Sequence, residues 1–180
     1  MTAKKAHDLD PLSLSILNTL AHVYFTSGNY KESEKTFLKV LDLDKNYSLT
    51  VHSLGWLYLH IKEYDKAEKL FLDFIKNENN DFKIATSLSY LYAKMGNMNK
   101  AEKYLNIIID QDKKHDMVSF SLDLAVVYIA FKDFDKVFYY LDKAYEERIG
   151  SLIFMQQDHW GELKGDPRYL DLLKRMDFID

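Results

Sequence analysis

The sequence predicts an all-α protein, a right-handed α-solenoid of helix-turn-helix repeats that ends in a capping helix. Similar residues recur about every 34 residues, which indicates an array of short repeated units. Within each unit, apolar residues follow the three-and-four spacing of two amphipathic helices. The chain of 180 residues contains only two prolines and six glycines, too few for the many turns of an all-β fold.

Four columns of equivalent residues define the repeat. The first is a tyrosine, at Tyr24, Tyr58, Tyr92 and Tyr128, with spacings of 34, 34 and 36 residues. The others are small residues ahead of the tyrosine (Ala21, Gly55, Ser89, Ala125), compact residues in the second helix (Ser33, Ala67, Ala101, Val137) and large apolar residues four positions later (Phe37, Phe71, Leu105, Leu141). The small columns predict a close approach of the two helices, with the large residues filling the space around it.

The columns divide the chain into four units, expected at residues 14–47, 48–81, 82–115 and 118–151. In the second unit, Val51, Leu54 and Tyr58 share one face of the first helix. Ala67 and Phe71 share one face of the second helix. Between the helices the four units read SGNY, IKEY, MGNM and FKDF, where a polar pair reverses the chain.

A different segment, residues 152–180, follows the last unit and is expected to cap the array. Asp166 is a suitable N-cap and Pro167 a suitable first residue for a helix. The expected apolar stripe of this helix consists of Tyr169, Leu170, Leu173 and Met176. Trp160 and Leu163 are expected to fill the gap between this helix and the last unit. A solenoid needs such a cap because its last unit otherwise exposes a core face to water.

The columns over residues 14–151 resemble the tetratricopeptide repeat, a family of 34-residue helix-turn-helix units. The resemblance implies one repeat domain over residues 1–180 and a role in protein–protein interaction. Residues 117–178, with the pattern W-x-x-L-x-x-DPRY-x-x-LL-x-x-M, also resemble the C-terminal ending of repeat arrays in bacterial multidomain proteins. In those proteins the array typically follows a winged-helix DNA-binding domain, a nucleotide cyclase or a kinase.

In the tetratricopeptide family, the first helix of each repeat lines a concave groove. The family's groove positions correspond here to Asn18, His22, Phe25, His52, Trp56, His60, Lys83, Tyr90, Lys94 and Asp123. His52, Trp56 and His60 are four residues apart and form one ridge. The groove is therefore expected to bind a peptide or helix, with Phe25, Trp56 and Tyr90 as apolar anchors. The alternative is that Trp56 is partly covered by its neighbours and that the histidines are merely solvated.

Some tetratricopeptide proteins grip acidic chaperone tails with a carboxylate clamp. The clamp needs Lys and Asn in one repeat, Asn in the next, and Lys and Arg in the third. The corresponding residues here are Asn18, His22, Ser53, Lys83 and Ser87, of which only Lys83 matches. Recognition of chaperone tails is therefore not expected.

No enzymatic centre, metal site or cofactor is expected. The chain has no cysteine, and His52 and His60 lie two helical turns apart, too far to share one ion. The acidic pairs Asp42 and Asp44, Asp110 and Asp112, and Glu146 and Glu147 stand at helix ends and loops and are interpreted as solvated charges. The sequence also contains no Gly-rich phosphate loop and no nucleophile elbow.

Charge and hydropathy narrow the range of partners. The net charge is −4 with interspersed signs, without the basic run that nucleic acid binding needs. No apolar stretch approaches the length of about 18 residues that spans a membrane. Neither nucleic acid nor a membrane is expected as a partner, and the expected location is the cytoplasm.

These observations leave two main hypotheses of function. The first is a non-catalytic scaffold that binds a partner peptide or helix in the concave groove. The second is a regulatory or oligomerisation domain of a larger bacterial signalling or transcription regulator, with self-association through the N-terminal face. A small-molecule sensor is a third possibility, for which the sequence offers no polar pocket.

The first residues suggest a further hypothesis. Residues 3–11, AKKAHDLDP, read as the last turn of a preceding repeat. Pro11 falls 34 residues before Lys45, where the family places its terminating proline. The hypothesis is that Met1 and Thr2 mark an artificial boundary and that the chain is the C-terminal part of a longer array.

Overall fold

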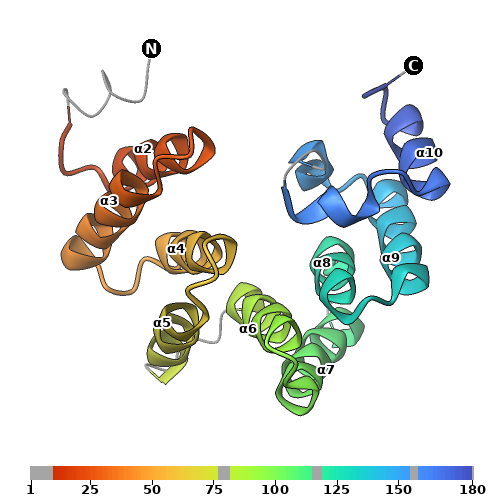
Figure 1. The fold of residues 1–180 in the computed structure, drawn as a ribbon, viewed down its shortest axis with the longest axis horizontal. Coiled ribbons are helices and arrows are strands. Elements are labelled where there is room, and N and C mark those ends of the chain that lie inside the picture. The colour runs from red at the N-terminus through yellow and green to blue at the C-terminus, as the bar shows by residue number, and fades with distance from the viewer. Residues whose placement is uncertain (1–9, 77–81, 115–118, 155–157, 180) are drawn as a thin grey trace. The chain divides into compact units, whose positions relative to one another are not determined.

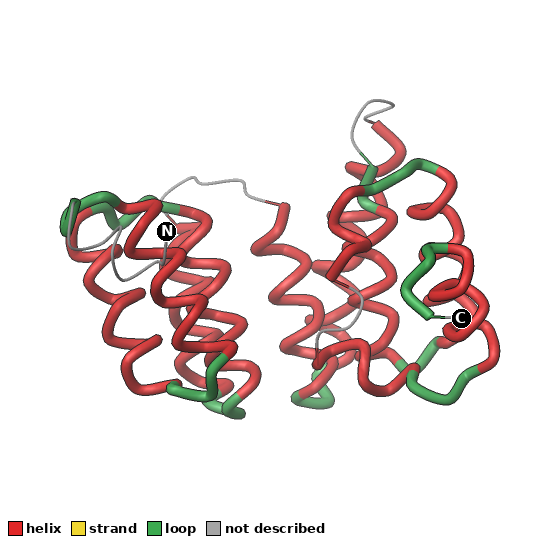
Figure 2. Tube along the Cα trace, turned by 90° about the horizontal axis from the view of Figure 1, so that it is seen from above, coloured by secondary structure: helices red, strands yellow, loops and turns green. Residues whose placement is uncertain are grey.

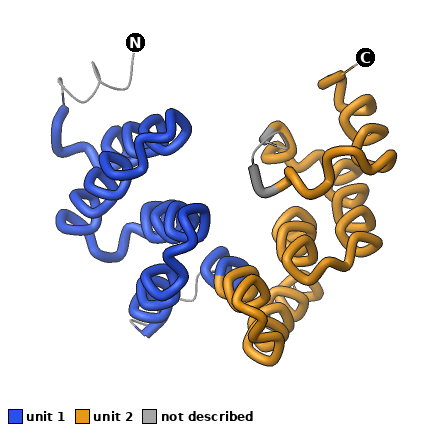
Figure 3. The backbone as a smooth tube through the Cα atoms, viewed as in Figure 1, with its two compact units in different colours: residues 1–87 blue, residues 88–180 orange. Residues whose placement is uncertain are grey.

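The computed structural model describes residues 10–76, 82–114, 119–154 and 158–179. The chain forms two compact units, residues 1–87 (unit 1) and residues 88–180 (unit 2), shown in Figure 3. The organisation as one domain with the repeat boundaries given above remains a prediction. Most of the hypothesised remnant of a preceding repeat, residues 3–9, lies outside the described residues.

The described part of the chain contains helices and no strand (Figures 1 and 2). The first four helices are α2 (Leu14–Thr26), α3 (Tyr30–Leu43), α4 (Ser48–His60) and α5 (Tyr64–Lys76), and α6 (Phe82–Lys94) runs from unit 1 into unit 2. Unit 2 continues with α7 (Met98–Lys114), α8 (Ser121–Phe131), α9 (Phe134–Glu146), the short 3-10 helices η1 (Gly150–Phe154) and η2 (Asp158–Leu163), and α10 (Pro167–Arg175). The prediction of an all-α fold built from consecutive helix pairs is confirmed.

In the first and third helix pairs, a hydrogen bond from a serine side chain joins the two helices. It lies where the columns of small residues predicted a close approach. In the first repeat the hydroxyl of Ser33 on α3 donates to the carbonyl oxygen of Ala21 on α2, at 2.8 Å. In the third repeat the direction is reversed, and Ser89 on α6 donates to the carbonyl oxygen of Ala101 on α7, at 2.9 Å. All four residues are fully buried. A serine is tolerated at this depth because its hydroxyl bonds the backbone of the partner helix.

The second repeat uses glycine at the same crossing. A Cβ added to Gly55 on α4 would lie 2.0 Å from Cζ of Phe71 on α5. The ring of Phe71, itself fully buried, therefore occupies the space that a side chain at position 55 would need. In the fourth repeat the equivalent residues are Ala125 and Val137, which are also fully buried. Across the four repeats this crossing holds nothing larger than valine.

One residue with a left-handed backbone fixes the turn inside each pair. These residues are Gly28, Lys62, Gly96 and Lys132, with φ of +77°, +63°, +76° and +60°. The next amide N–H then reaches back to the carbonyl oxygen of the column tyrosine. Asn29 bonds Tyr24 in this way at 2.8 Å, and Asp133 bonds Tyr128 at 3.2 Å. The geometry ends the first helix and favours glycine, because a Cβ is strained at a left-handed position.

The C-terminal segment covers the last repeat with two elements. α10 packs on α9, and η2 packs on α8. Asp166 caps α10 by accepting a hydrogen bond from the amide of Arg168, at 2.9 Å. Trp160 and Leu163 of η2 are buried, as expected for residues that fill a gap beside the last repeat.

The expected apolar stripe of α10 was wrong at one position. Leu170 is 42% exposed, whereas Leu172 is 1% exposed and packs inward. Tyr169, Leu172 and Leu173 are the buried residues of this helix. Their spacing of three and four residues keeps them on one face, and a residue directly after Tyr169 points about 100° away from it.

We predict that replacing Lys62 with glycine raises the free energy of unfolding by about 0.5–1 kcal/mol. Glycine adopts the left-handed backbone without the strain of a Cβ, and its greater freedom in the unfolded chain offsets part of the gain. Urea denaturation measures the change. The matched control is Lys69→Gly, at an exposed position within α5, which should lower the free energy of unfolding by about 1 kcal/mol. Equal effects of the two substitutions would contradict the role assigned to Lys62.

Candidate functional site

The predicted groove residues divide between the two units. Asn18, His22, Phe25, His52, Trp56, His60 and Lys83 belong to unit 1, and Tyr90, Lys94 and Asp123 belong to unit 2. Lys83 is exposed near the start of α6, and Asp123 is half-buried in the first turn of α8. Within each unit the structure brings several of the other residues together.

Two of the unit 1 residues connect α2 to α4. The amide oxygen of Asn18 accepts from the Thr50 hydroxyl at 2.7 Å, and both residues are buried. His22 Nε2 lies 2.9 Å from Ser53 Oγ. Since the Ser53 hydroxyl donates to the carbonyl oxygen of Leu49, at 2.8 Å, His22 donates through Nε2. Asn18 therefore holds the first two repeats together and is not a surface residue.

His22 has an exposed edge and a partly buried ring. The ring packs edge-on against Phe37, with ring centroids 5.4 Å apart. This partial burial lowers the pKa of His22 below its ordinary value of 6.5, because the charged form loses contact with water. The folded protein therefore favours neutral His22.

Four of the other predicted residues of unit 1, together with Tyr30 of α3, form the histidine-aromatic patch, which we define as Phe25, Tyr30, His52, Trp56 and His60. The Tyr30 hydroxyl and His60 Nε2 are 2.9 Å apart, and the rings of Phe25 and His60 meet edge-on with centroids 5.3 Å apart. On α4, Trp56 Nε1 donates to His52 Nε2 at 2.9 Å. His60 is exposed, and the other four residues are half-buried. The patch is an aromatic surface whose rings are already held in place by their mutual contacts.

In unit 2, Lys94 contacts the C-terminal segment. Its Nζ forms an ion pair with Glu162 of η2, at 2.8 Å, and lies 5.4 Å from the ring centroid of Tyr90. Lys132, just beyond α8, pairs with the other oxygen of the same carboxylate. Burial acts to raise the pKa of Glu162, but hydrogen bonds from the two lysines outweigh it and lower that pKa. Glu162 therefore stays ionised between two ammonium groups.

A lysine over each buried column tyrosine is a feature that the sequence interpretation missed. Lys66, Lys100 and Lys136 lie 5.3, 4.6 and 4.8 Å from the ring centroids of Tyr58, Tyr92 and Tyr128. Each lysine follows its tyrosine by eight residues, so a search for repeated charged positions finds these lysines. The first repeat has Glu32 at the equivalent position. These cation-π contacts hold the second helix of a pair over the first.

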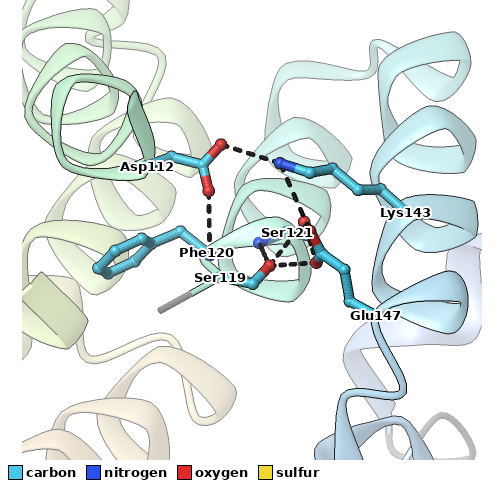
Figure 4. A network of polar contacts seen from close by, with 6 residues as sticks. All are labelled: Asp112, Ser119, Phe120, Ser121, Lys143 and Glu147. Atoms are coloured by element: carbon cyan, nitrogen blue, oxygen red, sulfur yellow. Dashed lines mark hydrogen bonds and ion pairs between the residues drawn. The ribbon is translucent and has the colours of Figure 1, made fainter. Parts of the chain in front are cut away.

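A polar network joins three helices of unit 2 (Figure 4). Its members are Asp112, Ser119, Phe120, Ser121, Lys143 and Glu147. Asp112 of α7 accepts from the amide of Phe120 at 3.1 Å and pairs with Lys143 of α9 at 3.2 Å. Glu147 accepts from the hydroxyls of Ser119 and Ser121, the latter at 2.9 Å. The network fixes the start of α8 to α7 and to the end of α9.

The network corrects the interpretation of Asp112 as a solvated charge, whereas Glu147 is exposed and bonds the two serines from the surface. The side chain of Asp112 is only 17% exposed, and Ser121 is fully buried. Burial acts to lower the pKa of Lys143, but its hydrogen bond to Asp112 and the nearby carboxylates raise it. Lys143 therefore stays charged and serves as an ion-pair partner, which is a structural role.

Two absences hold for the described ranges, residues 10–76, 82–114, 119–154 and 158–179. No cluster of three or more His, Asp or Glu side chains there is placed to hold a metal ion. No helix in these ranges is both long enough and apolar enough to cross a membrane.

Comparison with known protein families identifies the type of repeat. Two family models described as "Tetratricopeptide repeat" match the chain, one over residues 12–75 and the other over residues 82–115. The chain contains tetratricopeptide repeats. Tetratricopeptide repeats generally mediate protein–protein interaction, and their fold is typically non-catalytic.

Two solved structures share the tetratricopeptide fold with this chain. A tetratricopeptide repeat protein from Parabacteroides merdae has a TM-score of 0.57 and 16% identity, over 97% of this chain and 70% of that one. The pilF protein of Pseudomonas aeruginosa has a TM-score of 0.53 and 17% identity, over 91% of this chain and 71% of that one. At such identities the likeness shows the fold alone. None of the curated proteins matches the sequence.

We predict that His22 makes the stability of the protein depend on pH. Its folded pKa lies below the unfolded value of 6.5, so the unfolded chain binds the proton more tightly. The free energy of unfolding should therefore fall as the pH drops below about 6.5, and it should fall less in His22→Gln, which keeps a donor for Ser53. Urea denaturation at a series of pH values between about 7.5 and 5 compares the two proteins. Identical pH profiles would contradict the burial of this ring.

Proposed function

We propose that the chain is a non-catalytic interaction scaffold and that the histidine-aromatic patch binds a peptide or helix of a partner protein. The observation that carries the proposal is the Trp56–His52 pair on α4, half-buried and hydrogen-bonded at 2.9 Å. Leu49, three residues before His52 on the same helix, is 46% exposed and extends the apolar surface. Ordered aromatic rings with polar edges are typical of the centre of a binding surface.

The patch favours a partner segment with apolar side chains rather than a strongly charged one. Its described members carry no acidic or basic side chain other than histidine. The existing ring contacts, such as Phe25 with Tyr30 at 5.9 Å between centroids, reduce the number of rotamers that a partner must freeze on binding. The bacterial and cytoplasmic setting expected from the sequence is part of this proposal.

We predict that Trp56→Ala weakens partner binding by at least about tenfold, the loss expected for a buried aromatic anchor. Partners are first captured on the wild-type protein, and the dissociation constant of each is then measured for both proteins. The matched control is Tyr139→Ala, which removes an aromatic side chain that is 64% exposed on α9 of unit 2. Unchanged affinity in a folded Trp56→Ala protein would move the binding site elsewhere.

A second candidate function is self-association, as part of a larger bacterial regulator. A groove of about 610 Å³ is lined by both α2 and α3 of the first repeat. Leu17, Leu20 and Leu38 contribute its apolar lining, and Leu38 is 43% exposed. In a repeat array the corresponding surface of an inner repeat is covered by its neighbour, which makes this groove a suitable surface for a second copy.

If the first repeat mediates self-association, Leu38→Glu should shift the protein toward the monomer. A charge at this position would have to be desolvated when a second copy packs against it. Light scattering over a range of protein concentrations measures the mass. Leu170→Glu, at a leucine of almost equal exposure on α10, is the control and should leave the mass unchanged. A wild-type protein that is monomeric at every concentration would rule out this second candidate.

A further inference from the structure

The C-terminal segment reaches further back than a cap of the last repeat requires. Glu162 of η2 pairs with Lys132, which follows α8 in the fourth repeat, and also with Lys94, the last residue of α6 in the third repeat. Lys94 lies 34 residues after His60 and is therefore a groove position. η2 packs on α8, while α10 packs on α9 (Figure 1). Thus η2 contacts the first helices of two successive repeats, the helices that line a tetratricopeptide groove.

The repeat register identifies the covered surface. Starting from His22 and adding 34, 34 and 36 residues gives Trp56, Tyr90 and Val126. Tyr90 and Val126 in unit 2 are 8% and 9% exposed, whereas His22 is exposed and Trp56 half-buried in unit 1. The groove position that is accessible in both repeats of unit 1 is therefore buried in both repeats of unit 2.

We propose that the surface of unit 2 under η2 is a second peptide-binding site, and that Trp160–Leu163 is its resident ligand. The partner is a short acidic segment of another protein with the same chemistry: an aromatic residue, a carboxylate two positions later, and a leucine. The ring of Trp160 and the side chain of Leu163 are buried, and the carboxylate of Glu162 lies between Lys94 and Lys132. This site is separate from the histidine-aromatic patch, and the proposal does not rest on that patch.

The resident segment is held by contacts that a partner segment can replace. η2 is a 3-10 helix of six residues, which has poorer hydrogen-bond geometry than an α-helix. The side chains of the Lys94–Glu162–Lys132 ion pairs are between 25% and 59% exposed, and ion pairs of such exposure contribute little stability. A partner with its own aromatic residue and carboxylate would restore every one of these contacts. Opening of this segment alone also requires less free energy than global unfolding.

The test uses the full chain and a labelled peptide with the sequence of residues 158–166, DHWGELKGD. Glu162→Gln removes both ion pairs of the resident segment and leaves the two lysines in place. We expect the peptide to bind this variant about two- to tenfold more tightly than the wild-type protein, because the apparent affinity rises with the open fraction. Fluorescence anisotropy measures the affinity. The same peptide with glutamine in place of its glutamate should bind the variant about two- to tenfold more weakly.

Two controls separate a binding site from a structural cap. Glu146→Gln, the same change at an exposed position on α9, should bind the peptide as the wild-type protein does. Adding Lys94→Gln to Glu162→Gln should abolish the gain. If Glu162→Gln does not fold, as judged by circular dichroism, Glu162→Asp replaces it, since the shorter side chain weakens both ion pairs and leaves the two lysines in place.

Four results would overturn the proposal. The first is a folded Glu162→Gln or Glu162→Asp protein with no gain in peptide affinity. The second is equal binding of the glutamate and glutamine peptides. The third is a doubled mass of the variant by light scattering, which would mean that the segment exchanges between copies. The fourth is loss of peptide binding on Trp56→Ala, which would assign the binding to the histidine-aromatic patch.

Discussion

The fold depends on the close crossing of the two helices in each repeat. Ser33 and Ser89 cross-link their helix pairs through hydrogen bonds of 2.8 and 2.9 Å to a carbonyl oxygen of the opposite helix, and Gly55 leaves room for the ring of Phe71. In the second, third and fourth repeats, the column tyrosine lies three residues after the crossing, and a lysine of the second helix lies over its ring. A larger side chain at the crossing would separate the helices and remove these contacts together.

The helix pairs could be predicted from the sequence because each depends on residues close together in the chain. A small residue, a tyrosine three positions later and a polar pair in the turn all lie within one 34-residue unit. The direction of the serine hydrogen bonds could not be predicted, since either helix of a pair can carry the hydroxyl. The error at Leu170 has a similar origin. In a short helix, either of two sets of apolar residues can form the buried face. Packing against α9 buries the set that contains Leu172 and leaves Leu170 exposed.

The candidate site was harder to predict, because a column gives a position on a helix and not the neighbour that covers it. Asn18 occupies a groove position, yet its side chain accepts a hydrogen bond from Thr50 across the repeat boundary. Asp112 stands at a helix end as a solvated residue would, yet its partners, the amide of Phe120 and the side chain of Lys143, come from segments 8 and 31 residues away in sequence (Figure 4). Contacts of this kind depend on tertiary structure and cannot be predicted from the spacing of residues in the sequence.

The same column also differs in exposure between the two units. At the position that His22 and Trp56 occupy in unit 1, unit 2 has Tyr90 and Val126, both buried. Apolar residues on α8 such as Val126 and Ile129 are buried, and η2 packs on this helix. Burying such residues removes the cost of exposing them to water, so an apolar α8 favours a covering segment such as Trp160–Leu163. The histidine, tyrosine and tryptophan rings of unit 1 need such a cover less, because their polar edges can form hydrogen bonds at an exposed surface.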